Sequence, residues 1–202
     1  MPAPDMPAPE LPAPGTRPRP GPTLAKIVVA GPFSAGKSTL IRTISEVEVL
    51  STERPVTGGS SSGKTETTVA MDFGRITVDE DLVLLLFGAP GQGRFAFMWE
   101  ILGEGMLGYV LLVDNDQPEQ LHQAATILAA FRAGSAAPFV VALNRADPLT
   151  AGDQARVRVA LDLPTAVPVL GCDVTDRESV KAVLLALLVA AAAPGQPAAV
   201  PA

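Results

Sequence analysis

The sequence predicts an α/β domain built on a six-stranded, mostly parallel sheet with one antiparallel edge strand and helices on both faces. Two observations predict it. Short apolar runs alternate with stretches of helical periodicity, and one run with polar alternation joins the next through an acidic turn. The expected strands are residues 24–30, 69–78, 82–87, 108–113, 139–143 and 166–170.

The first strand ends at a glycine, as a buried strand should. In the second, Val69, Met71 and Phe73 alternate with Asp72, which the pattern assigns to the opposite face of a hairpin. The remaining runs are apolar throughout, which is typical of strands covered on both faces.

Helices are expected between the strands because the apolar residues there recur at a period of about 3.6. In the last helix, Thr175 with Glu178 three residues later predicts an N-terminal capping box. The expected helices are residues 39–48, 119–132, 152–161 and 175–193, and a further one begins among the aromatic residues near position 97.

Proline is concentrated at the two ends of the chain. The 202 residues include 20 prolines, nine of them in residues 1–22 and three in residues 190–202. Such composition favours solvated, extended chain with little to bury. We expect a disordered Pro/Ala-rich tail at 1–22, one domain at 23–193 and a disordered tail at 194–202. A passive spacer is the preferred interpretation of the first tail, and a PxxP docking ligand is the alternative.

Composition excludes several classes of protein. The single cysteine, Cys172, cannot form an internal disulfide, and a net charge of −6 argues against a nucleic-acid binder. The longest uncharged apolar run, residues 182–193, is twelve residues long, whereas a bilayer span needs about 20. We therefore expect a cytoplasmic protein without direct membrane insertion.

The strongest motif is a phosphate-binding loop from Gly31 to Ser38, which fits G-x-x-x-x-G-K-[ST] between a strand and a helix. Its glycines let successive N–H groups point inward, and the helix N-terminus adds partial positive charge. Lys37 is expected to reach the outer phosphates and the Ser38 hydroxyl to bind Mg²⁺. The loop residues expected to bind nucleotide are Gly31, Ser34, Ala35, Gly36, Lys37, Ser38 and Thr39.

Three more segments follow in order: TTVAMDF at 67–73, GAPGQGRF at 88–95 and NRAD at 144–147. With the phosphate loop, they resemble the small Ras-like P-loop GTPases. The resemblance is greatest to the bacterial conservon-type nucleotide-binding proteins, more distant to the bacterial polarity GTPases, Arf and Rab, and spans residues 24–193. It implies a Ras-like G domain with GTP or GDP and Mg²⁺ as ligands.

The NRAD segment carries the expected base specificity. Asp147 would accept hydrogen bonds from guanine N1–H and the 2-amino group, neither of which adenine offers. The resemblance implies that Asn144 holds this loop, that Arg145 lies along the base plane, and that Cys172 and Asp173 belong to the third base-contacting loop. Cys172 itself reads as a buried small side chain rather than a redox site.

The sequence also departs from the family. Gly88 stands where the family has a metal-holding aspartate, which leaves Ser38, phosphate oxygens and a threonine to bind Mg²⁺. Thr68 best matches that threonine, with Thr65 and Thr67 as rivals. The resemblance assigns Gly91 to nucleotide binding and Gln92 to the attacking water, and the expected catalytic residues are Gln92, Lys37 and Thr68. Bulk at Phe33 would crowd Gln92.

These residues predict a GTP-binding switch in which the γ-phosphate orders residues 51–68 and 88–99, with slow hydrolysis. For Arg54, Arg75 and Arg94, a surface position is preferred over an arginine-finger role. One alternative is a pseudo-GTPase interaction module that binds nucleotide without significant hydrolysis. Another is an ATP-dependent small-molecule kinase, although no acceptor pocket or arginine-bearing lid is evident in the sequence.

The resemblance also implies protein partners. These are a roadblock-type regulatory protein, an activating or exchange factor and a membrane sensor kinase, through which the chain would associate peripherally with the membrane. Among the aromatic residues at 95–99, we expect some to belong to the core and an exposed remainder to contact a partner.

Overall fold

The computed structural model describes residues 21–51 and 71–193. Within them lies a seven-stranded sheet with strand order β2-β3-β4-β1-β5-β6-β7. Its strands are β1 (Thr23–Ala30), β2 (Leu50–Ser51), β3 (Asp72–Thr77), β4 (Leu82–Gly88), β5 (Gly108–Asp114), β6 (Phe139–Asn144) and β7 (Val169–Cys172).

The predicted α/β fold with a mostly parallel sheet is confirmed. β1 lies at the centre, parallel to β4 and β5, and β6 and β7 continue the parallel order. β3 runs antiparallel to β4, as the acidic turn indicated. The difference is β2, which pairs antiparallel with β3 and adds a strand outside the expected edge. Two residues are too short for any periodicity to reveal.

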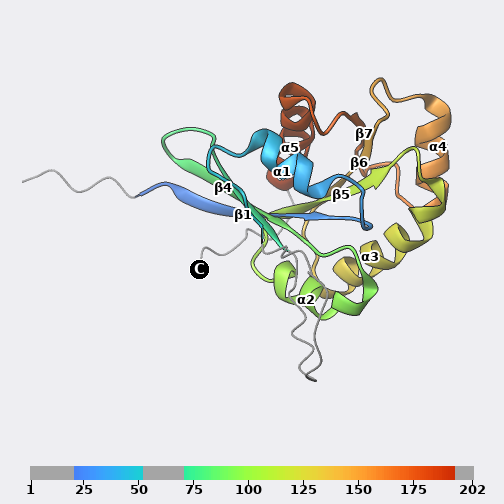
Figure 1. Cartoon of the computed structure of the whole chain (residues 1–202), viewed down its shortest axis with the longest axis horizontal. Helices are drawn as coiled ribbons and strands as arrows, with labels where there is room; N and C mark the ends of the chain where they lie inside the picture. Colours follow the sequence, from blue (N-terminus) through green and yellow to red (C-terminus); the bar gives the residue numbers. More distant parts are fainter. Residues whose placement is uncertain (1–20, 52–70, 194–202) are drawn as a thin grey trace, which may run out of the picture.

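Helices cover both faces of the sheet. Figure 1 shows α1 and α5 on one face and α2 and α3 on the other. The helices are α1 (Lys37–Ile44), α2 (Phe97–Gly103), α3 (Leu121–Gly134), α4 (Ala151–Ala160) and α5 (Arg177–Ala192), with short 3₁₀ turns η1 (Gly93–Phe95) and η2 (Pro118–Gln120). Each face has its own apolar core, one beneath α1 and α5 and the other beneath α2, α3 and α4.

Two helix ends differ from the sequence prediction. α1 stops at Ile44 rather than at 48 because the next residues bond to β3: the Glu46 N–H donates to the Arg75 carbonyl at 2.8 Å. α5 is capped by Asp176, whose carboxylate accepts the Ser179 N–H at 2.9 Å, and not by Thr175. The Thr175 hydroxyl instead donates to Asp173 at 2.7 Å, so it is unavailable as the cap.

No helix in the described part of the chain is long and apolar enough to cross a membrane. Several expectations concern residues outside that part. They are the two proline-rich tails (1–20 and 194–202) and, within 52–70, Arg54 and the candidate threonines Thr65, Thr67 and Thr68.

Tyr109 is the largest fully buried side chain of the core beneath α2, α3 and α4. Its ring stacks between Phe131 and Phe139, each at a centroid distance of 5.0 Å. Among the described residues, its buried hydroxyl has no hydrogen-bond partner. Burial therefore raises the pKa of Tyr109 well above its usual range.

We expect Tyr109→Phe to leave the free energy of unfolding unchanged or to raise it by about 1 kcal/mol, because the substitution removes an unsatisfied polar group and keeps both stacking contacts. Urea denaturation at pH 7 measures this. Tyr109→Leu, which loses the stacking, serves as the destabilised control. A loss of more than about 1 kcal/mol in Tyr109→Phe would show that the hydroxyl is bonded.

Candidate functional site

The phosphate-binding loop follows β1 at Ala30 and leads into α1 at Lys37. Gly31 and Gly36 have φ angles of 147° and 105°, which other residues rarely adopt. A Cβ at Gly31 would lie 2.1 Å from the Leu112 carbonyl oxygen of β5. Both glycines are thus required by the backbone path of the loop.

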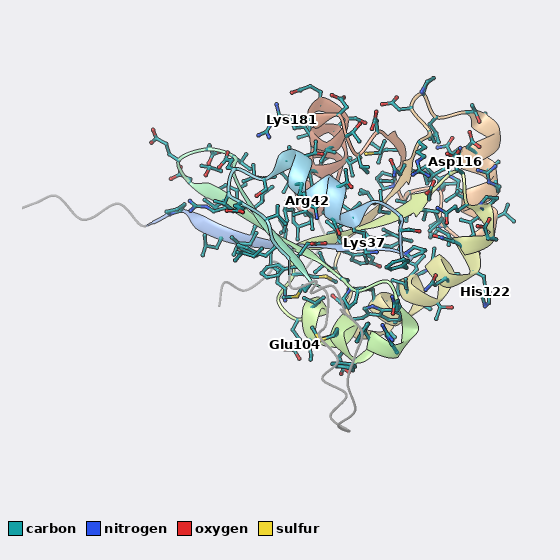
Figure 2. The ribbon with its side chains drawn as sticks, viewed as in Figure 1. Lys37, Arg42, Glu104, Asp116, His122 and Lys181 are labelled. Atoms are coloured by element: carbon teal, nitrogen blue, oxygen red, sulfur yellow. The ribbon has the colours of Figure 1, made fainter. Side chains whose placement is uncertain are left out.

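Lys37 crosses the inside of this loop. Its Nζ donates to the Gly31 carbonyl at 2.9 Å and to the Pro32 carbonyl at 2.6 Å. Figure 2 shows Lys37 at the start of α1, close to the sheet. A carbonyl-bound ammonium of this kind can exchange those bonds for phosphate oxygens, since a lysine is a mobile point charge.

The loop forms one wall of a pocket of about 330 Å³. The pocket is also lined by the end of β4 and by residues after it, which include the Gly91–Gln92 pair predicted from the sequence. Thus the phosphate-binding loop and the GAPGQGRF segment, both predicted from the sequence, line the same cavity. The lining residues are Phe33, Ser34, Gly36, Lys37, Ser38, Thr39, Asp72, Gly88, Ala89, Pro90, Gly91, Gln92, Arg94 and Phe95.

Asp72 is the pocket residue that sequence reasoning missed. Its carboxylate oxygen Oδ2 accepts a hydrogen bond from Ser38 Oγ at 2.5 Å. The apolar alternation with Phe73 placed Asp72 on the polar face, but it is buried, with 8% of its surface exposed, and pairs in register with Gly88. The sequence alone does not reveal this pairing, which sets the Asp72 carboxylate beside Gly88.

The Gly91 segment is fastened to the rest of the site. A Cβ at Gly91 would lie 2.4 Å from the Phe33 amide nitrogen, so this residue packs directly on the phosphate-binding loop. Trp99 Nε1 donates to the Pro90 carbonyl at 2.8 Å, and Gln123 Nε2 donates to the Gly91 carbonyl at 2.6 Å. Gln92, half-buried, follows on the pocket wall.

Asn144 joins the phosphate-binding loop to the NRAD segment. It ends β6 and is buried, with 4% of its surface exposed. Its Nδ2 donates to the Ala35 carbonyl at 3.1 Å, while its Oδ1 accepts the N–H groups of Arg145 at 3.0 Å and Val174 at 3.3 Å. One amide therefore contacts three of the loops that were expected to hold the nucleotide: the phosphate-binding loop, the NRAD segment and the loop after β7.

The Arg145 guanidinium is held by Asp114. The distance from Arg145 Nη1 to the buried Asp114 Oδ2 is 2.7 Å, and a φ of 62° at Arg145 sets the direction of the side chain. About half of that side chain (53%) remains exposed. The pair fixes where a flat cation lies beside the NRAD segment.

Asp147 is oriented from α5. Ser179 Oγ donates to Asp147 Oδ2 at 3.1 Å and accepts the Asp173 N–H at 3.0 Å. Sequence reasoning did not single out Ser179, which lies 32 residues from Asp147 and belongs to no motif. It connects the carboxylate expected to face the base with the loop after β7.

Cys172 is fully buried and free. Burial raises the pKa of its thiol to about 11, with smaller contributions from Asp173, Asp147 and Asp176. A thiol with such a pKa stays protonated near neutral pH and is a poor nucleophile.

The candidate arginine fingers and the aromatic residues near α2 differ in where they lie. Arg94 lines the pocket and lies over the Phe95 ring at 4.8 Å, whereas Arg75 is exposed on β3 and does not line it. Phe95 and Trp99 are buried, and Phe97 and Phe33 are each 58% exposed. The aromatic residues near α2 therefore divide between core and surface.

The donor set of the pocket suits a hard divalent cation. No group of three or more His, Cys, Asp or Glu side chains gathers as a metal site in residues 21–51 and 71–193. A hydroxyl and a carboxylate do meet, at Ser38 and Asp72. Mg²⁺ prefers oxygen donors and commonly takes one or two from the protein, with phosphate oxygens and water completing the octahedron.

A glycine-rich loop between a parallel strand and a helix, with polar loops gathered at the same sheet edge, defines a P-loop nucleotide-binding protein of the α/β class. The family model described as "Conserved hypothetical ATP binding protein" matches residues 57–193, which is more than half of the chain. The chain belongs to this family of nucleotide-binding proteins. No curated protein matches it.

For Cys172, we expect slow alkylation by iodoacetamide at pH 7.5 in the folded protein and fast alkylation in 8 M urea, on the order of 100-fold apart. Because the folded pKa is raised, the folded thiol does not ionise while the unfolded thiol does, so stability falls as pH rises from about 9 toward 11. Mass spectrometry follows the alkylation, and urea denaturation at pH 8 and pH 10 follows the stability. Equal alkylation rates in the two states would contradict this assignment.

Proposed function

We propose that this protein is a GTP-binding switch of the Ras-like type that hydrolyses GTP slowly to GDP. The observation that carries the proposal is the contact between Asn144 and the Ala35 carbonyl. It brings the loop bearing Asp147 against the phosphate-binding loop, so one mononucleotide can contact both.

Base selection follows from the carboxylate of Asp147. Guanine presents two donors, N1–H and the 2-amino group, to one carboxylate, whereas adenine presents an acceptor at N1 and would leave the carboxylate unsatisfied. The hydrogen bond from Ser179 to one carboxylate oxygen supports this role because it limits rotation of the side chain. Arg145, held by Asp114, would lie beside the base.

At the phosphate end, Lys37 and the loop N–H groups would neutralise the phosphates, and Gln92 would orient the attacking water. When bound, Mg²⁺ would neutralise charge on the β- and γ-phosphates. We place threonine coordination at Thr68. Hydrolysis would be slow, at about 10⁻⁴ s⁻¹ as in unassisted relatives, because no arginine finger is expected within the chain and because Phe33 and Gly88 are unfavourable at their positions. An arginine supplied by a partner can raise such rates about 10⁵-fold.

The protein partners suggested by the conservon resemblance, a roadblock-type regulator and a membrane sensor kinase, belong to this proposal. Support comes from the exposed apolar side chains of Phe33, Phe97 and Ile101, at least half exposed on the pocket rim and on α2. Partners that read the bound nucleotide would contact this region, since it adjoins the segment that senses the γ-phosphate.

Two competing functions can be separated by titration. The family description names ATP, and a small-molecule kinase would prefer it. We expect fluorescent GDP and GTP to bind and unlabelled ATP to compete at least about 100-fold more weakly. Preferential ATP binding would overturn the proposal. Tight GTP binding with no GDP formed over a day would instead identify a pseudo-GTPase interaction module.

Asp147→Asn tests base recognition directly. The asparagine amide can accept from N1–H and donate to a 2-carbonyl, which is the pattern of xanthine, so we expect preference to shift from GDP to XDP by about 100-fold or more. Competition binding measures both nucleotides. Asp162→Asn, at an exposed turn after α4, is the matched control and should keep the wild-type preference. An unchanged preference in Asp147→Asn would show that this residue does not face the base.

Lys37→Ala tests the phosphate end. We expect it to weaken GDP and GTP binding by about 100-fold or more, because the ammonium that reaches the phosphates is removed. Circular dichroism and the melting temperature should change little, since the lysine is partly exposed at the pocket surface. Lys181→Ala on α5 is the control for loss of one positive charge. An affinity of Lys37→Ala for GDP and GTP within about tenfold of wild type would contradict the assignment.

A further inference from the structure

Position 88, at the end of β4, carries no acidic side chain in this protein. In the family that the sequence resembles, an aspartate at the end of this strand supports Mg²⁺, and here it is glycine. A strand pair in register nevertheless places Asp72 of β3 directly opposite Gly88 of β4. An ideal Cβ at Gly88 would lie 3.3 Å from both Cβ and Oδ2 of Asp72. The absence of a side chain at 88 therefore provides the room that the Asp72 carboxylate occupies.

The hydrogen bond from Ser38 indicates what the Asp72 carboxylate does in the pocket. A hydroxyl has one proton and two lone pairs. Because the proton of Ser38 Oγ is directed at Asp72 Oδ2, with the oxygens 2.5 Å apart, the lone pairs of Oγ stay free for another partner. Ser38 and Asp72 both line the pocket that contains Lys37, so that partner would lie where the phosphates are proposed to bind.

Burial strengthens the effect of the charge. Asp72 is 8% exposed, and a carboxylate in such surroundings attracts a cation more strongly than one in water. Two protein oxygens alone do not make a complete magnesium site, so phosphate oxygens and water must complete the coordination. Cation binding here therefore has to depend on bound nucleotide.

We propose that Asp72 replaces the missing aspartate of position 88 as the acidic residue of a nucleotide-dependent Mg²⁺ site. Its carboxylate accepts the hydrogen bond from the Ser38 hydroxyl, which leaves the Ser38 lone pairs for the metal. It also supplies the negative charge beside the phosphates. The inference rests on the proposed nucleotide-binding function. It transfers the acidic charge from β4 to the adjacent antiparallel strand β3.

The test measures the release of fluorescent GDP with excess Mg²⁺ and with EDTA. In the wild-type protein, we expect chelation to speed release by about tenfold or more. In Asp72→Asn, which keeps the size and loses the charge, release with Mg²⁺ should be as fast as wild-type release in EDTA. Release of the two proteins in EDTA should be the same. The exposed Asp81→Asn, at the far end of the β3–β4 turn, is the matched control and should behave as wild type.

A relocation variant tests the geometry. In Asp72→Gly/Gly88→Asp, the carboxylate returns to β4 and the contacts with Asp72 disappear, leaving the Ile41 Cδ1 methyl at 3.1 Å as the close neighbour. We expect this double variant to regain magnesium dependence that Asp72→Gly alone lacks. Melting temperatures verify that each variant folds.

The outcomes separate the two proposals. If wild-type protein binds no guanine nucleotide, both fail. If it binds nucleotide and release is insensitive to Mg²⁺, or if Asp72→Asn keeps the full effect of Mg²⁺, the Asp72 site is overturned while the guanine-binding function stands. Loss of the magnesium effect in Asp72→Asn, with unchanged release in EDTA, supports the site.

Discussion

The buried amide of Asn144 is the constraint on which the arrangement of the site depends. Its hydrogen bonds reach the Ala35 carbonyl and the N–H groups of Arg145 and Val174, which belong to three loops far apart in the sequence. Without it, the buried Ala35 carbonyl and the Val174 N–H would lose this partner, at a cost of about 1–3 kcal/mol for each unsatisfied group. The Arg145 N–H would keep its second acceptor, the Cys172 carbonyl at 2.9 Å. The loops are thus held together by one side chain at the end of β6.

The sequence predicted the parts of the structure that depend on local pattern. Apolar runs gave the six longer strands, and the glycine and lysine spacing gave the loop at Gly31–Ser38, because both arise from backbone requirements that recur in any context. What it could not predict depends on pairing between strands or helices. Asp72 looked polar because it alternates with Phe73, yet its burial follows from α1 packing over β3 and from the glycine opposite it.

The role of Ser179 could not be predicted from the sequence either, because it too depends on a contact between distant elements. Nothing about a serine in the first turn of a helix indicates that it bonds to a carboxylate 32 residues away. The capping residue of α5 was also misassigned by one position, since Thr175 bonds to Asp173 and leaves Asp176 as the cap. Side-chain hydrogen bonds of this kind are decided by the loop geometry and not by residue spacing.

The bond from Ser179 to Asp147 gives α5 a mechanical connection to the loop after β6. The same helix lies across the sheet with Leu185 and Val189 more than half exposed on its outer side. A force applied there that tilts the first turn of α5 would be transmitted through Ser179 to the Asp147 carboxylate and to the loop after β7. The outer side of α5 is therefore mechanically coupled to the carboxylate that we propose recognises the base.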